Sequence, residues 1–151
     1  MINKYDVKIQ GNDKLSNNFI VREFACKDGT PEVLICDRLI YVLQSIRDEF
    51  NKPVKIVSGY RTPAYNSMCG GAPKSQHIKG TACDISVAGV SNFQIVNFVK
   101  KKLNWVSVGW YDNWVHIDTR NAYGEPTQNW CEIKGEKELK IAVKLCIDNI
   151  K

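Results

Sequence analysis

The chain has 151 residues, a length that fits one domain with a real hydrophobic core. Hydrophobic residues make up 44% and charged residues 25% of the sequence, which excludes a disordered chain, a collagen and a coiled coil. The formal net charge is +5, but the one compact basic run ends a predicted helix and no nucleic-acid-binding motif accompanies it. No apolar run reaches the roughly 20 residues of a membrane span. We therefore expect a monomer with neither a nucleic-acid nor a membrane partner.

The first 20 residues and the cysteines bear on the compartment. Residues 1–20 mix Asn, Asp and Lys with scattered apolar residues and contain no signal-peptide core. We therefore expect a protein made in the cytoplasm, which would need help such as lysis to leave the cell. Six cysteines without a CxxC pair argue against a zinc ribbon, and reduced thiols are expected. Three of them lie among apolar residues and should be buried, namely Cys36, Cys83 and Cys146.

The first predicted regular element is a helix over residues 32–51, which follows a polar, irregular segment over residues 1–29. Thr30 and Pro31 have the pattern of an N-cap followed by a proline in the first helical turn. Apolar residues then recur at helical spacing, at Val33, Cys36, Leu39, Ile40, Leu43, Ile46 and Phe50.

Short strands and helices alternate over the rest of the chain. The expected strands cover residues 54–57, 81–86, 105–110 and 114–118. The expected helices cover residues 62–68, 91–103 and 136–150. The last helix should turn one face toward the core, with Leu139, Ala142, Val143, Cys146 and Ile150. Because the spacing is not that of regular βαβ units, the pattern favours an α+β fold with a small antiparallel sheet flanked by helices.

Three polar residues in the second half of the chain are candidates for chemistry. The sequence has two histidines, His77 and His116, and the second lies between apolar residues of the predicted strand 114–118. Asp84 should project from the strand 81–86 on the face opposite its apolar neighbours, and a buried carboxylate needs a partner because an unpaired charge is costly. If the two strands are neighbours, these three side chains converge on one point.

Two imidazoles and one carboxylate are a common ligand set of catalytic zinc sites, which keep a fourth position open for water. The alternative is that each histidine is an ordinary hydrogen-bonded residue of the core or surface. Both histidines, like Asp84, are polar residues in or next to predicted apolar strands, which favours a shared role. From the residues alone, metal binding and the ordinary hydrogen-bonded role both stay open.

The segments around these residues contain recognisable motifs. Residues 75–84 read SQHIKGTACD, residues 58–61 read SGYR and residues 115–118 read VHID. In this order and spacing the motifs resemble those of the zinc D-Ala-D-Ala carboxypeptidase family of murein peptidases, which is related in fold to Hedgehog and lysostaphin-type domains. The resemblance, to the small single-domain branch in phages and bacteria, covers residues 16–120. Residues 121–151 carry no family motif and are expected to be a C-terminal extension with a helix, within a single domain over 1–151.

The resemblance assigns roles to named residues. It implies that one zinc ion is bound by His77, Asp84 and His116. It also implies that Arg61 binds substrate and stabilises the oxyanion, as a planar, permanently charged guanidinium can, with a structural salt bridge as the alternative. Ser75 and Gln76 of the first motif are expected at the substrate, although Ser75 could instead orient His77 or cap a turn.

The general base is where the sequence departs from the family pattern. Many relatives carry Glu or Asp three residues before the last histidine, and here that position is Asn113, whose amide cannot accept a proton. Asp118 should share a strand face with His116, so it is the first candidate for the base or for a partner that orients a ligand. Asp112 is the second candidate.

The resemblance implies a zinc-dependent peptidase that cleaves peptidoglycan stem peptides or cross-bridges at the bacterial cell wall. Carboxypeptidase and endopeptidase specificities are both compatible with these ligands, and a phage endolysin that reaches the wall after lysis is one form of such an enzyme. The alternative is a zinc-containing wall-binding or structural module with little hydrolysis, which Asn113 keeps open. A nucleic-acid-binding protein would rest on charge alone.

Overall fold

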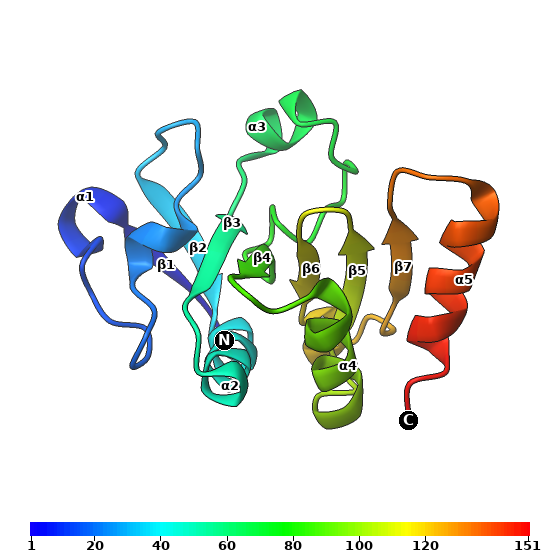
Figure 1. Ribbon diagram of the computed structural model, residues 1–151. Helices are drawn as coiled ribbons and strands as arrows, with labels where there is room; N and C mark the ends of the chain where they lie inside the picture. Colours follow the sequence, from blue (N-terminus) through cyan, green and yellow to red (C-terminus); the bar gives the residue numbers. More distant parts are fainter.

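The computed structural model describes residues 1–151 and has the α+β architecture predicted from the sequence (Figure 1). The strands are β1 (Ile2–Asp6), β2 (Glu32–Cys36), β3 (Val54–Ser58), β4 (Ala82–Val87), β5 (Ser107–Tyr111), β6 (Val115–Asp118) and β7 (Asn129–Glu132). The α-helices are α1 (Val7–Gln10), α2 (Asp37–Phe50), α3 (Pro63–Met68), α4 (Asn92–Lys102) and α5 (Lys137–Asp148). Two 3₁₀ helices are η1 (Val21–Phe24) and η2 (Arg120–Tyr123). None of the helices is long and apolar enough to cross a membrane.

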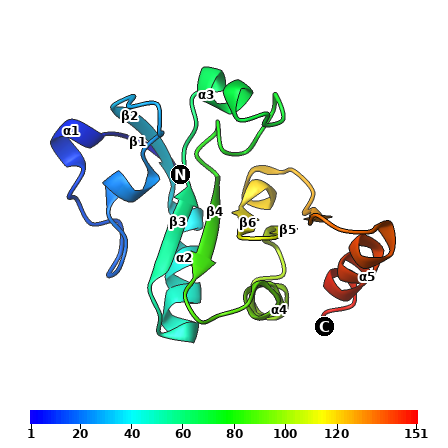
Figure 2. The same cartoon turned by 45° about the horizontal axis from the view of Figure 1, so that its top comes forward.

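The strands form two sheets. β1 and β2 make an antiparallel pair, and the other five strands follow the order β3-β4-β6-β5-β7. Four of these five pair antiparallel with their neighbours, as predicted. β7, which the sequence did not predict, joins β5 in parallel and makes the larger sheet mixed. α2 and α4 lie on one side of the sheet and α5 lies beside β7, as the turned view also shows (Figure 2).

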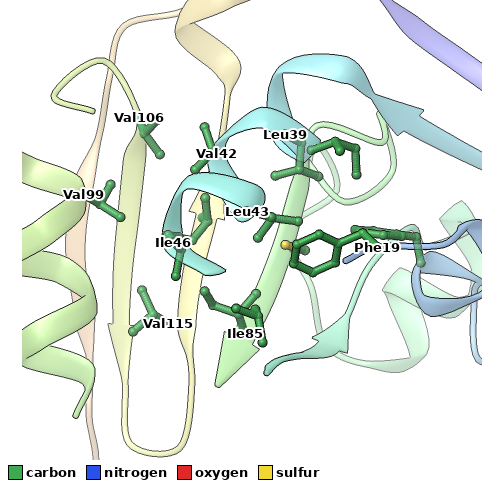
Figure 3. Packing of buried hydrophobic residues seen from close by; sticks show 14 of the residues in the cluster. Phe19, Leu39, Val42, Leu43, Ile46, Ile85, Val99, Val106 and Val115 are labelled. Carbon is green, nitrogen blue, oxygen red and sulfur yellow. The ribbon is translucent and has the colours of Figure 1, made fainter. Parts of the chain in front are cut away.

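The core lies between the larger sheet and the helices α2 and α4 (Figure 3). Leu43 and Ile46 of α2 lie close to Ile85 of β4, while Val99 of α4 faces β5 and β6, where Val115 points inward. All five side chains are completely buried. Burying each contributes about 1.5–3 kcal/mol to stability. Because strand side chains alternate, the polar residues between these apolar ones must point to the opposite face.

The helix predicted over residues 32–51 is correct only from Asp37 onward. The residues before it form β2, and Cys36 is the N-cap of α2. Val33 and Ile35 are 0% and 2% exposed, and Glu32 and Leu34 beside them are more exposed, so over these four residues a strand alternation overlaps the helical spacing. Pairing with β1 satisfies the backbone of this segment as a strand.

The first 29 residues, predicted to be irregular, contain β1, α1 and η1. Thr30 and Pro31 do not cap a helix. The Pro31 carbonyl instead accepts a hydrogen bond from the Val7 backbone N–H (2.8 Å), next to the β1–β2 pair. A tertiary contact with a distant segment therefore decides the structure here, and no local pattern signals it.

The last helix was predicted in the right place, but its inner face was predicted only in part. Ile147 is completely buried, and Val143 and Ile150 pack against the core. The exposed residues of the predicted face are Leu139, Ala142 and Cys146. Cys146 is therefore not a buried hydrophobe, whereas Cys36 and Cys83 are completely buried as predicted.

Candidate metal centre

The face of the larger sheet opposite the helices carries the polar residues singled out in the sequence. β4 and β6 are neighbours, and their register places Asp84 directly opposite His116. Their apolar neighbours along the strands turn to the core, so both side chains point to the other face. His77 comes from the loop between α3 and β4 and completes the group. The sequence therefore correctly predicted that these three residues meet.

The three side chains converge closely. Oδ1 of Asp84 lies 3.0 Å from Nδ1 of His116 and 3.4 Å from Nε2 of His77. One ligand atom from each residue falls within 4.8 Å of the others, and the two imidazole rings lie 5.1 Å apart at 70°. Their exposures are only 3% for His77, 5% for Asp84 and 7% for His116. Buried nitrogen and carboxylate donors that converge in this way are suited to a divalent metal ion.

The second nitrogen of each histidine has its own partner. Nδ1 of His77 donates to the carbonyl of Gly59 (2.8 Å), and Nε2 of His116 donates to Oδ2 of Asp118 (2.9 Å). Both acceptors lack a proton to give, so these two nitrogens carry protons. The other nitrogen of each ring faces Asp84, to which it donates when it is protonated, and in a neutral ring it is free to bind a metal ion. Such outer hydrogen bonds are the usual way in which a protein orients histidine ligands. The donor set therefore fits a zinc ion.

Electrostatics also favour a cation at this point. Burial alone would raise the pKa of Asp84, but hydrogen bonds from His116 and His77 and the charge of these rings lower it below its ordinary value. Burial alone would lower the pKa of His116, but its bonds to Asp118 and Asp84 raise it instead. The carboxylate is thus ionised at neutral pH, and either a proton or a metal ion offsets its charge.

Asp118, the first candidate for the general base, is completely buried beside His116. Arg120 donates to both of its oxygens, with Nε 2.8 Å from Oδ1 and Nη2 2.7 Å from Oδ2. Burial would raise the pKa of Asp118, but the bonds from Arg120 and His116 lower it to about 2. Its carboxylate is occupied by these partners and does not line the pocket described below.

Asp112, the second candidate, lies in the exposed turn between β5 and β6. Its Oδ2 accepts a hydrogen bond from the backbone N–H of Lys134 (2.9 Å). Neither Asp112 nor the adjacent Asn113 lines the pocket over the metal centre. The structure therefore does not bring Asp112 or Asn113 to the pocket that holds the candidate metal ligands.

Arg61 lies directly against the metal centre. Its Nη2 contacts Oδ2 of Asp84 at 3.2 Å, and its Nε donates to Oγ of Ser58 at 3.0 Å. Nη1 donates to the buried Asn66 at 3.4 Å. The guanidinium thus has the salt bridge considered as its alternative role, and it also lines the pocket.

Ser75 and Gln76 support the loop that carries His77. Oγ of Ser75 accepts a hydrogen bond from the backbone N–H of His77 (3.2 Å). The side chain of Gln76 is buried, accepts from Oγ1 of Thr81 (2.7 Å) and donates to Glu125 (2.9 Å). Both residues line the pocket, although their polar atoms already have protein partners.

A pocket of about 460 Å³ opens over the metal centre. Three basic residues line it, Arg61, Lys74 and Arg120, and so do three aromatic ones, Tyr111, Trp114 and Trp130. Asp84 is its only carboxylate. The pocket is therefore basic and aromatic, with its one acid among the candidate metal ligands.

Sequence reasoning did not find Arg120 or Trp130. Arg120 comes two residues after Asp118, and the adjacent charges of the segment DTR were the available signal. Trp130 lies 14 residues beyond His116 in a segment without a motif, and only the unpredicted strand β7 brings it to the pocket.

The profile of the Peptidase M15 family matches residues 14–118. The chain therefore belongs to the Peptidase M15 family. Peptidoglycan L,D-endopeptidase MepK of Escherichia coli K12 is 35% identical over 100 residues, which are 60% of this chain and 50% of that protein. Probable peptidoglycan L,D-endopeptidase MepK of Haemophilus influenzae is 32% identical over 87 residues, 53% of this chain and 44% of that protein. The chain spans about half the length of these curated relatives.

Proposed function

We propose that this chain is a zinc-dependent peptidase that cleaves peptide bonds in peptidoglycan. The observation that carries the proposal is the buried convergence of Nε2 of His77, Oδ1 of Asp84 and Nδ1 of His116. Both relatives named above are peptidoglycan L,D-endopeptidases by name, one of them probable, which favours an endopeptidase over a carboxypeptidase. A phage endolysin stays one possible setting for this activity.

His77, Asp84 and His116 would hold the zinc ion, because each offers one unblocked donor atom toward a common point. When bound, zinc polarises a peptide carbonyl and activates the attacking water. The carbonyl of Gly59 and the carboxylate of Asp118 hold the two imidazoles in the tautomers that such binding requires.

Arg61 would stabilise the negative charge that develops on the scissile carbonyl. Its position supports this role, since the guanidinium lines the pocket and is held by three separate partners: Ser58, Asn66 and Asp84. A donor fixed before the reaction stabilises a transition state without further reorganisation. The side chain is only 15% exposed, so water does not strongly screen its charge.

Asp118 would orient His116 and would not accept a proton from water. Its carboxylate is completely buried and takes two hydrogen bonds from the Arg120 side chain as well as the one from His116. A general base must reach the proton that it removes, and Asp118 does not line the pocket.

The second candidate function, a zinc-containing module that binds the wall with little hydrolysis, has one specific observation in its favour. Apart from Asp84, no carboxylate lines the pocket, so a general base of the usual kind is missing there. A module of this kind would bind peptidoglycan without releasing peptides.

Two measurements test the proposed function. Metal analysis of the purified protein should find one zinc per chain, and His77→Ala and His116→Ala should both lose it. Full zinc in both variants would contradict the ligand assignment. The zinc-loaded protein should also release peptides from purified peptidoglycan, and binding without release would favour the second candidate.

A further inference from the structure

Trp130 belongs to a row of residues that crosses the larger sheet through the metal centre. In neighbouring strands, Asp84 lies opposite His116, His116 opposite Gly109, and Gly109 opposite Trp130. Figure 1 shows the corresponding strands β4, β6, β5 and β7 side by side. Neighbouring strands are about 4.8 Å apart, so a side chain of β7 reaches one of β6 only across the residue between them.

Gly109 makes this contact possible. A Cβ at position 109 would lie 2.5 Å from Cε2 of Trp130 and 2.7 Å from its Nε1, closer than real Cβ atoms approach other atoms. The indole therefore crosses over the glycine and reaches His116, where the two rings lie 4.9 Å apart at 48°. Any larger residue at this position would push the indole away from the histidine.

The indole is itself held in place. Its Nε1–H donates to the hydroxyl of Tyr111 (3.1 Å), and the guanidinium of Arg120 lies 5.7 Å from its ring centre. The same Arg120 binds the carboxylate that holds Nε2 of His116. Trp130 and Asp118 thus contact His116 from different directions and share one partner.

We infer that Trp130 is a positioning residue for the metal ligand His116, an inference that rests on the proposed function. The imidazole contacts both the ring of His77 (5.1 Å) and the indole (4.9 Å), and Asp118 holds one of its nitrogens. A ring confined in this way keeps Nδ1 aimed at the metal point and loses little freedom when the metal binds. Trp130 also lies outside residues 14–118, so the C-terminal segment is part of the centre.

The competing role for Trp130 is that of a pocket wall that only touches substrate. The two roles predict changes in different measured quantities, KM and zinc affinity. A wall residue affects KM and leaves the affinity for zinc unchanged, because zinc binding needs no substrate. A positioning residue changes the zinc affinity of the protein alone.

The test measures zinc affinity by competition with a chromophoric chelator in the parent, Trp130→Ala, Trp130→Phe and Trp114→Ala. Loss of outer support for a ligand typically weakens metal binding about 10–100-fold, which we expect for Trp130→Ala. Trp130→Phe keeps an aromatic ring beside His116 and should recover most of the affinity. Trp114 lines the same pocket, but its ring stacks on Tyr111 and not on His116, so Trp114→Ala should bind zinc like the parent.

A second arm leaves the tryptophan in place. Gly109→Ala should displace the indole and weaken zinc binding, yet add no further loss in the Trp130→Ala background, because the two changes act through one contact. If Trp130→Ala does not fold, Gly109→Ala still decides, because it displaces the indole without removing it. Parent-like zinc affinity in Gly109→Ala and in every folded Trp130 variant would overturn the inference. A parent that binds zinc but cleaves no peptidoglycan would instead remove the proposed function and leave the positioning role intact.

Discussion

At the scale of single residues, the centre is defined by hydrogen bonds behind the candidate ligands. Asp118 shares a strand face with His116, as the alternation of the strand predicted, and this placed it among the candidate bases. Sequence reasoning could not foresee that Arg120 would take both of its oxygens, because that bond depends on the turn into η2. The carboxylate that appeared free in the sequence is fully engaged in the fold.

The role of Asp118 can be tested by Asp118→Asn. The amide can donate to Nε2 of His116 and so favour the tautomer that protonates Nδ1, which would weaken zinc binding about 10–100-fold. We expect kcat at saturating zinc to be largely retained. A fall in kcat of about 10²–10⁴ at saturating zinc would show that Asp118 is the general base. Asp112→Asn is the matched control and should keep both the zinc affinity and kcat.

Arg61→Lys tests the proposed oxyanion role. Lysine keeps the positive charge but loses the planar fork that contacts Ser58, Asn66 and Asp84 together. We expect kcat for peptide release to fall about 10²–10³-fold, the usual effect of losing one oxyanion donor, with zinc content unchanged. Arg47→Lys, on the exposed side of α2, is the control. Turnover at the parent rate in Arg61→Lys would make Arg61 a structural residue.

At the scale of elements, local sequence patterns predicted most of the helices and strands. They failed where pairing with a strand distant in the sequence determines the local structure. Strands β3 to β6 and helices α3 and α4 lie where β-branched runs, caps and prolines placed them. β2 was predicted as part of a helix because its short sequence fits the helical spacing as well as a strand. Only its pairing with β1 decides in favour of the strand. β7 has only four residues, and although Gly124 and Pro126 before it signal a turn, no local pattern indicates that it pairs in parallel with β5, so the place of Trp130 could not be predicted.

The junction between β2 and the loop of His77 gives a prediction at this scale. Gly80 has φ +74°, and a Cβ there would lie 2.5 Å from the carbonyl oxygen of Leu34. Gly89 has nearly the same φ, +76°, with no atom within 4 Å. Chemical denaturation should show a loss of about 1–2 kcal/mol for Gly89→Ala, from the left-handed backbone alone. Gly80→Ala should lose about 1–3 kcal/mol more, from the clash with β2. Equal losses of stability in the two variants would mean that β2 shifts to accommodate the added methyl group without destabilising the protein.

At the scale of the whole molecule, the sheet separates stability from chemistry. One face packs against α2 and α4, and the other carries the metal centre and its basic, aromatic pocket. The C-terminal segment, for which the sequence predicted only a helix, supplies one wall of that pocket through β7 and joins the core through Ile147. The site therefore depends on residues beyond those that match the family profile.

The buried carboxylate of Asp118 makes the stability of the metal-free protein depend on pH. Its pKa is about 2 in the folded protein against an ordinary value of 3.8. A lowered folded pKa adds stability that is complete above about pH 4 and is lost as the pH falls toward 2. The free energy of unfolding from denaturant titrations should thus fall by about 2 kcal/mol over this range because of Asp118. In Asp118→Asn, the free energy of unfolding should lose this part of its dependence on pH. The same pH dependence as in the parent would contradict the role of Asp118.

We propose that a zinc ion held by His77, Asp84 and His116 makes this chain a peptidoglycan peptidase. The most direct test is mass spectrometry of the soluble products from purified peptidoglycan incubated with the chelated protein, with the zinc-restored protein and with zinc-treated His116→Ala. We expect new peptide fragments, with one type of bond cleaved, only from the zinc-restored parent. The same fragments from the chelated protein or from His116→Ala would contradict the zinc-dependent activity. The absence of fragments from a zinc-loaded parent would contradict it as well.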